Sequence, residues 1–270
     1  MEIKNKLFDN GNLVVNEGFV DLLECNDLLT AEKLYNVESD SVKSVLKERG
    51  TSRAILRDKN GDDVETFIKR YSEPPLKEKI KLKIFFKPKT SDAFDEWNAI
   101  VDFHKNELGT MIPIAVGRFA GKTFNLTLGI QNYIRAAELF PSVKDDEERK
   151  NGLILKMAKY VGKMHRLGFT HQDLYLVHFF IKELEDDKFY LIDLQRTTRA
   201  DTLSNRWHVK DLAQLLFSSH SWAKPEDVEL FWNEYTKEYG VELRENTSFI
   251  NSVKSKAQRI LNRDRRKAGK

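Results

Sequence analysis

The first half of the chain alternates apolar and polar residues in the manner of β-strands. Three such runs follow one another at residues 42–47, 54–57 and 64–71. The intervening segments at 49–51 and at Asn60-Gly61 carry glycine and predict turns. The pattern therefore predicts a small antiparallel sheet.

Helical spacing of apolar residues dominates elsewhere. It occurs at residues 28–35, with Asp27 or Thr30 as N-cap, at 76–84, 91–107 and 154–168, and from 207 to the end. Further strands are expected at 112–119, 123–130 and 190–194. A front rich in strands followed by a helical back predicts an α+β protein with two lobes.

This order of elements predicts how the chain divides into parts. We expect an N-terminal cap at residues 1–40, an N-lobe at 41–130 and a C-lobe at 131–270 that ends in a basic helix. The boundary between the lobes should lie near residues 129–132.

Composition places the chain among soluble globular proteins. Of its 270 residues 40% are apolar and 32% charged, and the net charge is +3 with a pI near 8.7. A single cysteine, Cys25, excludes a disulfide framework and a cysteine zinc site, and fits a reducing compartment. Residues 1–10 lack the apolar run of a signal peptide, and no segment is apolar for the length of a membrane span. We therefore expect a cytoplasmic protein, at most peripheral to a membrane.

Two short segments carry the candidate chemistry. HQDL at residues 171–174 follows the long helical pattern, and LIDL at 191–194 places Asp193 twenty residues after Asp173. Phosphoryl transfer needs such a pair, one carboxylate for the proton of the attacking hydroxyl and one for Mg²⁺ on the phosphates. It also needs a cation, which Lys69 could supply from the third strand with Glu96 as its partner.

These residues resemble the protein-kinase-like pattern in order and spacing. The segment HQDLYLVHFFI at 171–181 is similar to the catalytic loop of the lipopolysaccharide core heptose kinases, the WaaP group. LIDLQR at 191–196, RWHVKDLA at 206–213, EWNAI at 96–100 and MHR at 164–166 also resemble that family. The resemblance covers residues 45–220.

The resemblance implies a role for each residue. Asp173 would be the catalytic base, and Asp193 would chelate Mg²⁺ on the ATP phosphates. Lys69 would contact these phosphates while Glu96 holds it. His171 and Asp211 would support the loop. The acceptor would be a heptose of the lipopolysaccharide inner core or its lipid-linked precursor, at the cytoplasmic face of the inner membrane of a Gram-negative bacterium.

The sequence departs from protein kinases at several positions. His178 stands five residues after Asp173, where protein kinases carry a metal-binding asparagine, and imidazole is a poor ligand for Mg²⁺. There is no glycine-rich loop, so phosphate binding would rest on the turn around Gly50, on Lys69 and on Arg53. Gln172 replaces the arginine of the His-Arg-Asp triplet, which argues against regulation by a phosphorylated activation loop. Gln195 stands where the heptose kinases often carry histidine.

Two basic stretches bear on the partner. Residues 69–89 carry a net charge of +6 and residues 254–270 a net charge of +7. They could attract anionic lipid or the acidic groups of lipopolysaccharide, or they could be solvated surface. No basic motif interleaved with aromatic residues supports nucleic-acid binding.

Three alternatives to a heptose kinase stay open from the sequence. One is another sugar kinase on the same fold, such as a Kdo kinase. Another is a protein kinase that phosphorylates tyrosines, including its own. The third is a scaffold without activity that binds nucleotide or lipid.

Overall fold

The computed structural model of the chain describes residues 2–46, 49–71, 92–200 and 205–269. The chain forms two compact units. The first contains residues 1–107 and 111–131, and the second contains residues 108–110 and 132–270. The division into a cap and two lobes at residues 40 and 130 stays a prediction, and each unit is described here by itself.

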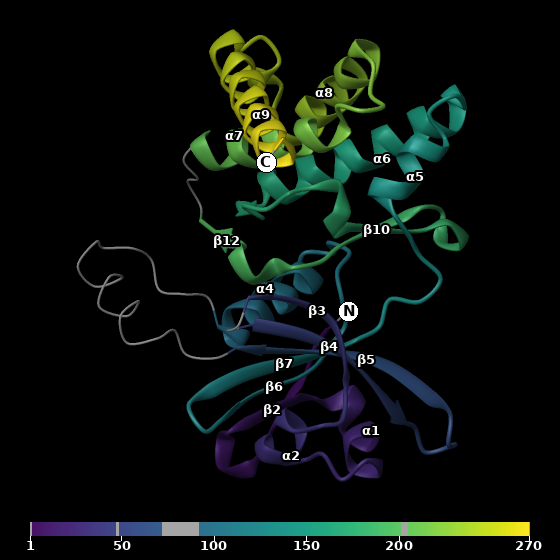
Figure 1. The fold of residues 1–270 in the computed structure, drawn as a ribbon, viewed down its shortest axis with the longest axis vertical. Coiled ribbons are helices and arrows are strands. Elements are labelled where there is room, and N and C mark those ends of the chain that lie inside the picture. Colours follow the sequence, from purple (N-terminus) through teal and green to yellow (C-terminus); the bar gives the residue numbers. More distant parts are fainter. Residues whose placement is uncertain (1, 47–48, 72–91, 201–204, 270) are drawn as a thin grey trace, which may run out of the picture. The chain divides into compact units, whose positions relative to one another are not determined.

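A seven-stranded antiparallel sheet forms the centre of the first unit within the described residues (Figure 1). Its spatial order is β1 (Asn5–Phe8), β2 (Leu13–Asn16), β6 (Pro113–Phe119), β7 (Lys122–Leu128), β5 (Asp63–Tyr71), β4 (Arg49–Arg57) and β3 (Asp40–Leu46). The three predicted antiparallel strands are its β3, β4 and β5, so this part of the prediction is confirmed.

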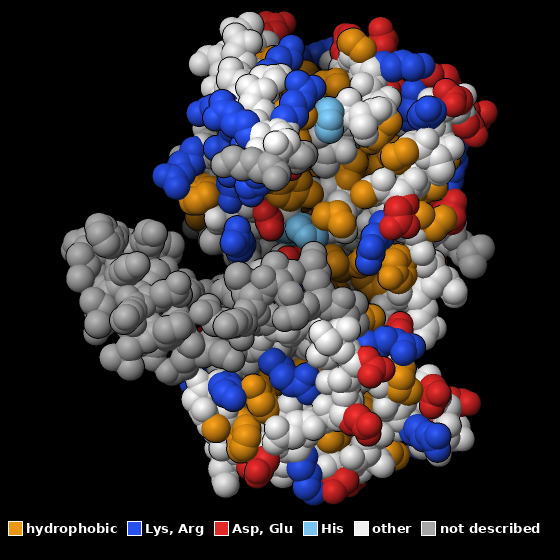
Figure 2. Space-filling model, in the orientation of Figure 1, with side chains coloured by type: hydrophobic (Ala, Val, Ile, Leu, Met, Phe, Trp, Pro, Cys, Tyr) orange, Lys and Arg blue, Asp and Glu red, His pale blue; other side chains and the backbone are white. Residues whose placement is uncertain are grey.

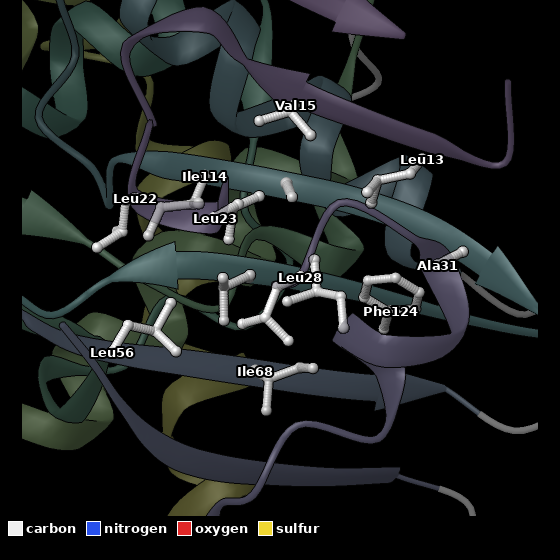
Figure 3. Packing of buried hydrophobic residues seen from close by; sticks show 13 residues of the cluster. Leu13, Val15, Leu22, Leu23, Leu28, Ala31, Leu56, Ile68, Ile114 and Phe124 are labelled. Atoms are coloured by element: carbon white, nitrogen blue, oxygen red, sulfur yellow. The ribbon is translucent and has the colours of Figure 1, made fainter. Parts of the chain in front are cut away.

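One face of this sheet is covered by two short helices, α1 (Val20–Cys25) and α2 (Ala31–Tyr35). Apolar side chains from these helices and from β2, β4, β5, β6 and β7 point toward one another in Figure 3 and are excluded from water. Thr30 caps α2, because its side chain accepts a hydrogen bond from the Lys33 backbone N–H at 3.3 Å. Burial of this apolar surface fixes which way each strand faces.

Helix α4 (Ala93–Lys105) packs on the opposite face. Its start is set by a capping box in which the Asp92 side chain accepts from the Asp95 N–H, and the Asp95 side chain accepts from the Asp92 N–H. Trp97 and Val101 are buried beside Tyr71 of β5. The capping box uses the side chains of Asp92 and Asp95. The third acidic residue at this end of the helix, Glu96, faces inward.

The structure corrects the N-terminal part of the prediction. The sequence reading did not identify β1, β2 or α1. The turn expected at 49–51 is wrong, because these residues begin β4 and Gly50 pairs with Arg70. Gly50 has no left-handed backbone angle, so strand pairing prevails over the turn tendency of glycine. The helix expected at 76–84 lies outside the described residues.

The second unit is mostly helical. Its helices are α5 (Ala136–Ser142), α6 (Glu147–Arg166), α7 (Asn205–Ser219), α8 (Pro225–Tyr239) and α9 (Thr247–Ala268). Helix α6 packs against α8, and α7 packs against α9. Gly168 ends α6 with a φ of +81°, and a Cβ there would lie 2.5 Å from the Ala200 carbonyl oxygen. A sheet-rich unit and a helix-rich unit confirm the expected α+β class.

Short strands and 3₁₀ turns connect these helices. The strands are β8 (Ile134–Arg135), β9 (Phe169–Thr170), β10 (Phe179–Lys182), β11 (Lys188–Leu191) and β12 (Thr198–Arg199). They form one three-stranded sheet, β11-β10-β8, and one pair, β12-β9, among the described residues. The strand predicted at 190–194 is β11 and ends three residues earlier, because Asp193 takes a left-handed backbone conformation.

A large apolar cavity lies among the helices of the second unit. It measures about 390 Å³ and is lined by side chains of α5 to α9, including Phe140, Met157 and Trp222. Neither Asp173 nor Asp193 lines it. Apolar walls do not stabilise phosphate charges, so this cavity does not suit a phosphorylated ligand.

Candidate active site

The first candidate group is a cation held on the sheet of the first unit. The Lys69 Nζ atom lies 2.6 Å from Glu96 Oε1, which joins β5 to α4. Glu96 is 1% exposed, whereas the Lys69 side chain is 21% exposed. The ion pair therefore fixes the ammonium group on the sheet, while part of the Lys69 side chain stays exposed to solvent.

The sequence reading missed two partners of Glu96. Tyr71 donates its hydroxyl to Glu96 Oε2 at 2.7 Å, and Asn125 donates its amide N–H to the same oxygen at 2.8 Å. Tyr71 is two residues from Lys69 and so shares its face of β5, and Asn125 is the cross-strand partner of Lys69. The signal for Asn125 was a single polar residue between the apolar neighbours Phe124 and Leu126.

Arg53 lies on the same face of the sheet as Lys69. Strand register pairs Thr51 with Lys69 and Arg53 with Phe67, and residues two apart on a strand share a face. The Arg53 guanidinium pairs with Glu65, and this hydrogen bond raises its pKa. Arg53 is thus already bonded to a carboxylate, and its contact with phosphate stays a prediction.

A side chain of α7 holds the backbone of the loop at residues 171–178 through hydrogen bonds. Asp211, fully buried, accepts the backbone N–H of His171 at 2.8 Å with one oxygen and that of Gln172 at 2.7 Å with the other. Its carboxylate also lies 3.4 Å from His165 Nε2. Gln172 has a φ of +64°, so these bonds stabilise a backbone conformation that side chains other than glycine rarely adopt.

His171 ties this loop to the segment that carries Asp193. Its Nδ1 accepts the Asp173 N–H at 3.3 Å, so its other nitrogen, Nε2, carries the proton and donates to the Ile192 carbonyl at 3.0 Å. Complete burial lowers the pKa of His171, mainly through desolvation of the charged form. In this tautomer the lone pair of Nδ1 already accepts the Asp173 N–H, so the neutral imidazole is a structural link.

Asp173 follows in the loop and is half-buried. Its Oδ1 accepts a hydrogen bond of 3.3 Å from Gln214, whose own Oε1 accepts the Leu174 N–H at 3.1 Å. Gln214 is three residues after Asp211 and therefore on the same face of α7, which is the spacing that could have identified it. Helix α7 thus orients the loop backbone with one side chain and the Asp173 carboxylate with the next.

The structure brings Asp173, His178 and Asp193 together. One ligand atom from each lies within 4.8 Å of those of the other two. Asp193 has φ +64° and ψ +50°, and His178 Nε2 lies 3.8 Å from Asp193 Oδ2. Because His178 donates its Nδ1–H to the Asp173 carbonyl at 2.7 Å, Nε2 is the ring nitrogen that faces Asp193.

These residues fit a divalent cation. Two carboxylates and one imidazole offer hard oxygen ligands and one nitrogen ligand, and a ring N–H bonded to a backbone carbonyl is the usual second contact of a ligating histidine. The separation of 3.8 Å between His178 Nε2 and Asp193 Oδ2 is short enough for one ion to contact both atoms at metal–ligand distances of about 2.1 Å.

Comparisons with known proteins show which family the chain resembles. The family model described as "Lipopolysaccharide kinase (Kdo/WaaP) family" matches residues 32–239. A protein of Escherichia coli K12 named "Lipopolysaccharide core heptose(I) kinase WaaP" is 29% identical, over 83% of this chain and 89% of its own length. A protein of Pseudomonas aeruginosa with the same name is 35% identical over 47% of this chain, and the match spans 52% of its length.

Proposed function

Because the chain belongs to the lipopolysaccharide kinase (Kdo/WaaP) family, we propose that it transfers the γ-phosphoryl group of ATP to a heptose hydroxyl of the lipopolysaccharide inner core. Membership of a kinase family implies the use of ATP. The heptose acceptor rests on the names of the relatives.

Asp173 is the catalytic base in this proposal. Its carboxylate accepts the proton of the acceptor hydroxyl while that oxygen bonds to the γ-phosphorus and the bond from phosphorus to the ADP oxygen breaks. The hydrogen bond from Gln214 supports the role, because it fixes the carboxylate without neutralising it. His171 is excluded as the base by its buried, neutral tautomer.

Asp193 is the principal ligand of the metal ion. Mg²⁺ bound there would neutralise the phosphate charge that develops during transfer. The left-handed backbone of Asp193 supports the role, since strained residues gather at functional sites. His178 completes the ligand set with a nitrogen atom, which suits Mn²⁺ better than Mg²⁺.

Lys69 is the phosphate-binding cation in this proposal, and Glu96 positions it. The ion pair with Glu96 fixes the ammonium group, which would reduce the side-chain freedom lost when Lys69 contacts the α- and β-phosphates. Arg53 is a second candidate on the same face.

The observation that carries the proposal is the convergence of Asp173, His178 and Asp193 on one point of a chain in a kinase family. We would measure transfer of labelled phosphate from ATP to dephosphorylated core oligosaccharide. Asp173→Asn should lower the rate at least about hundredfold. Asp145→Ala, which removes an exposed carboxylate from the same unit, should leave it unchanged.

Other outcomes identify the alternatives. Transfer to the acidic sugar Kdo and not to heptose would indicate a Kdo kinase, and label on protein tyrosine would indicate a protein kinase. No nucleotide binding would indicate a scaffold and contradict the proposal.

The acceptor is membrane-linked in this proposal, so the enzyme would work peripherally at the cytoplasmic face of the inner membrane. None of the described helices has the length and apolar character to cross a bilayer. The basic C-terminal helix α9 supports attraction to an anionic surface. Flotation with vesicles containing anionic lipid, at low and high salt, tests this location.

A further inference from the structure

Three cations of the second unit lie close together, and one of them, Lys210, lies near Asp173. They are Lys210 on α7, Lys256 on α9 and Arg196, which lies in the 3₁₀ turn η5 (Leu194–Arg196) that directly follows Asp193. Lys210 interacts electrostatically with both of the other cations and with Asp173 and Asp211. Figure 2 shows that Lys and Arg side chains gather on this part of the unit, over α7 and α9. We name these three residues the basic cluster.

The cluster has no ion-pair partner among the described residues. Lys210, Lys256 and Arg196 form no ion pair or hydrogen bond there. Many other Lys and Arg side chains of the unit do form ion pairs with carboxylates. Examples are Arg149, Lys150, Lys156, Arg166, Lys224 and Lys237. Asp211 and Asp173 attract Lys210 electrostatically, but neither forms an ion pair with it among the described residues.

Placing these cations together is unfavourable in the unliganded protein. Lys210 and Lys256 are half-buried, and partial burial of an ammonium group without a partner carries a desolvation cost. Burial is the main cause that lowers the pKa of Lys210, and the charges of Arg196 and Lys256 lower it further, against Asp211 and Asp173. An anion bound between the three side chains would relieve both effects.

Packing holds the cluster in position. Lys210 precedes Asp211, whose carboxylate is bonded to the catalytic loop, and its ammonium lies 5.7 Å from the centre of the Trp207 ring. Lys256 lies between Val253 and Ala257, which are buried in the packing of α9. Lys210 is therefore attached to the helix that orients Asp173, and Lys256 to α9, which packs on that helix.

We propose that the basic cluster binds an anionic group, a carboxylate or a phosphate, on the sugar acceptor beside the hydroxyl that is phosphorylated. This inference rests on the proposed function and adds to it that the enzyme selects a negatively charged acceptor. The alternative source of such an anion is the nucleotide. The acceptor is favoured because Lys256 lies outside residues 32–239, the part that matches the family model, whereas nucleotide binding is common to kinases.

Two variants separate these sources. Lys210→Met keeps the aliphatic stem beside Trp207 and removes the charge, and Lys210→Arg restores it. The control is Lys267→Met, which removes one charge from the exposed end of α9, about 16 Å along the helix from Lys256. The probes are ATP, a core oligosaccharide that carries acidic sugars, and the same oligosaccharide with its carboxyl groups reduced to alcohols.

Loss of one charged contact should raise the KM for the acidic oligosaccharide about tenfold in Lys210→Met, with kcat and the KM for ATP nearly unchanged. Lys210→Arg should recover most of the loss, and Lys267→Met should match the wild type. Reducing the carboxyl groups should weaken binding to the wild type and have little further effect on Lys210→Met, if the bound anion is a carboxylate. An effect that follows phosphate substituents instead would assign the anion to a phosphate.

Calorimetric binding of the oligosaccharide without ATP keeps this test separate from the proposed activity. If the wild type binds the acidic oligosaccharide through Lys210 but transfers no phosphate, the proposed reaction fails and the anion site stands. If charged and uncharged oligosaccharides bind equally, if no oligosaccharide binds, or if Lys210→Met weakens ATP alone, the anion site is overturned.

Discussion

The ammonium of Lys69 lies 2.6 Å from the carboxylate of Glu96, and the two members of this pair differ sharply in exposure. Glu96 is 1% exposed and also accepts from Tyr71 and Asn125, whereas the Lys69 side chain is 21% exposed. Glu96 is thus the buried and more strongly bonded member of the pair. Removing the charge of Lys69 and removing the charge of Glu96 should therefore change stability by different amounts.

We expect Lys69→Met to destabilise the protein more than Glu96→Gln. Lys69→Met leaves a buried carboxylate with two neutral donors, which should lower the free energy of unfolding by about 3 kcal/mol. Glu96→Gln keeps an acceptor for Tyr71 and leaves an ammonium that can reach water, which should cost about 1 kcal/mol. Urea unfolding measures both, with the exposed Lys6→Met as control. Equal losses would contradict the asymmetry. Both variants should lose phosphoryl transfer.

Asp211 should act on the catalytic loop through backbone hydrogen bonds. Asp211→Ala leaves the N–H groups of His171 and Gln172 without acceptors, and each unsatisfied buried group costs about 1–3 kcal/mol. We expect a stability loss of about 3 kcal/mol and faster hydrogen exchange at these two amides, and a smaller loss in Asp211→Asn, which keeps one acceptor oxygen. Exchange that stays slow at both amides in Asp211→Ala would show that other contacts fix the loop.

His208 should make the folded protein less stable in acid. Its ring is buried between His165 and Tyr239, and neither ring nitrogen has a hydrogen-bond partner among the described residues. Burial, helped by His165, lowers the pKa of His208 to about 4 from its ordinary value of 6.5. Between these two values the unfolded chain binds a proton that folded His208 does not, so stability falls as the pH falls.

The loss due to His208 should be complete near pH 4 and amount to about 3 kcal/mol, since each pKa unit is worth about 1.4 kcal/mol. Urea unfolding from pH 7.5 to 4 should show a shallower decline in His208→Phe than in the wild type, while the exposed His220→Phe should keep the wild-type slope. His171, whose pKa burial also lowers, contributes to the decline that remains. An unchanged slope in His208→Phe would contradict the prediction.

The sequence predicted the main elements because their patterns are local. Alternation in β5 and apolar spacing in α6 lie within one element each, and the sequence named Glu96 as the partner of Lys69. The structure gives the physical reason why Glu96 and not a neighbouring acid pairs with Lys69, since the side chains of Asp92 and Asp95 form the helix cap.

Contacts between distant segments could not be predicted from local sequence patterns. Asn125 joins Glu96 only because β7 pairs with β5, and Gln214 reaches Asp173 only because α7 lies under the loop. The strand β2 was missed because its value to the fold is its pairing with β6, about a hundred residues later. Gly50 shows the reverse error, in which a local turn tendency was overruled by pairing across the sheet.

His178 should change which metal ion the site prefers. Its Nε2 is the one nitrogen in a set that otherwise consists of the carboxylates of Asp173 and Asp193. Nitrogen ligands favour Mn²⁺ over Mg²⁺, whereas the amide oxygen of asparagine suits Mg²⁺. His178→Asn should therefore weaken Mn²⁺ binding about tenfold relative to Mg²⁺ binding.

The measurement is titration of Mn²⁺ by electron paramagnetic resonance, alone and in competition with Mg²⁺, on the protein without nucleotide. The control is His220→Asn, because His220 also lies 2.7 Å, through its Nδ1, from a backbone carbonyl, that of Phe217, but belongs to no cluster of potential ligands among the described residues. If His178→Asn binds both ions as the wild type does, His178 is no ligand. Its contact with the Asp173 carbonyl would then be its whole contribution, and the variant should lose loop rigidity, seen as faster amide exchange at residues 173–178, without a change in metal preference.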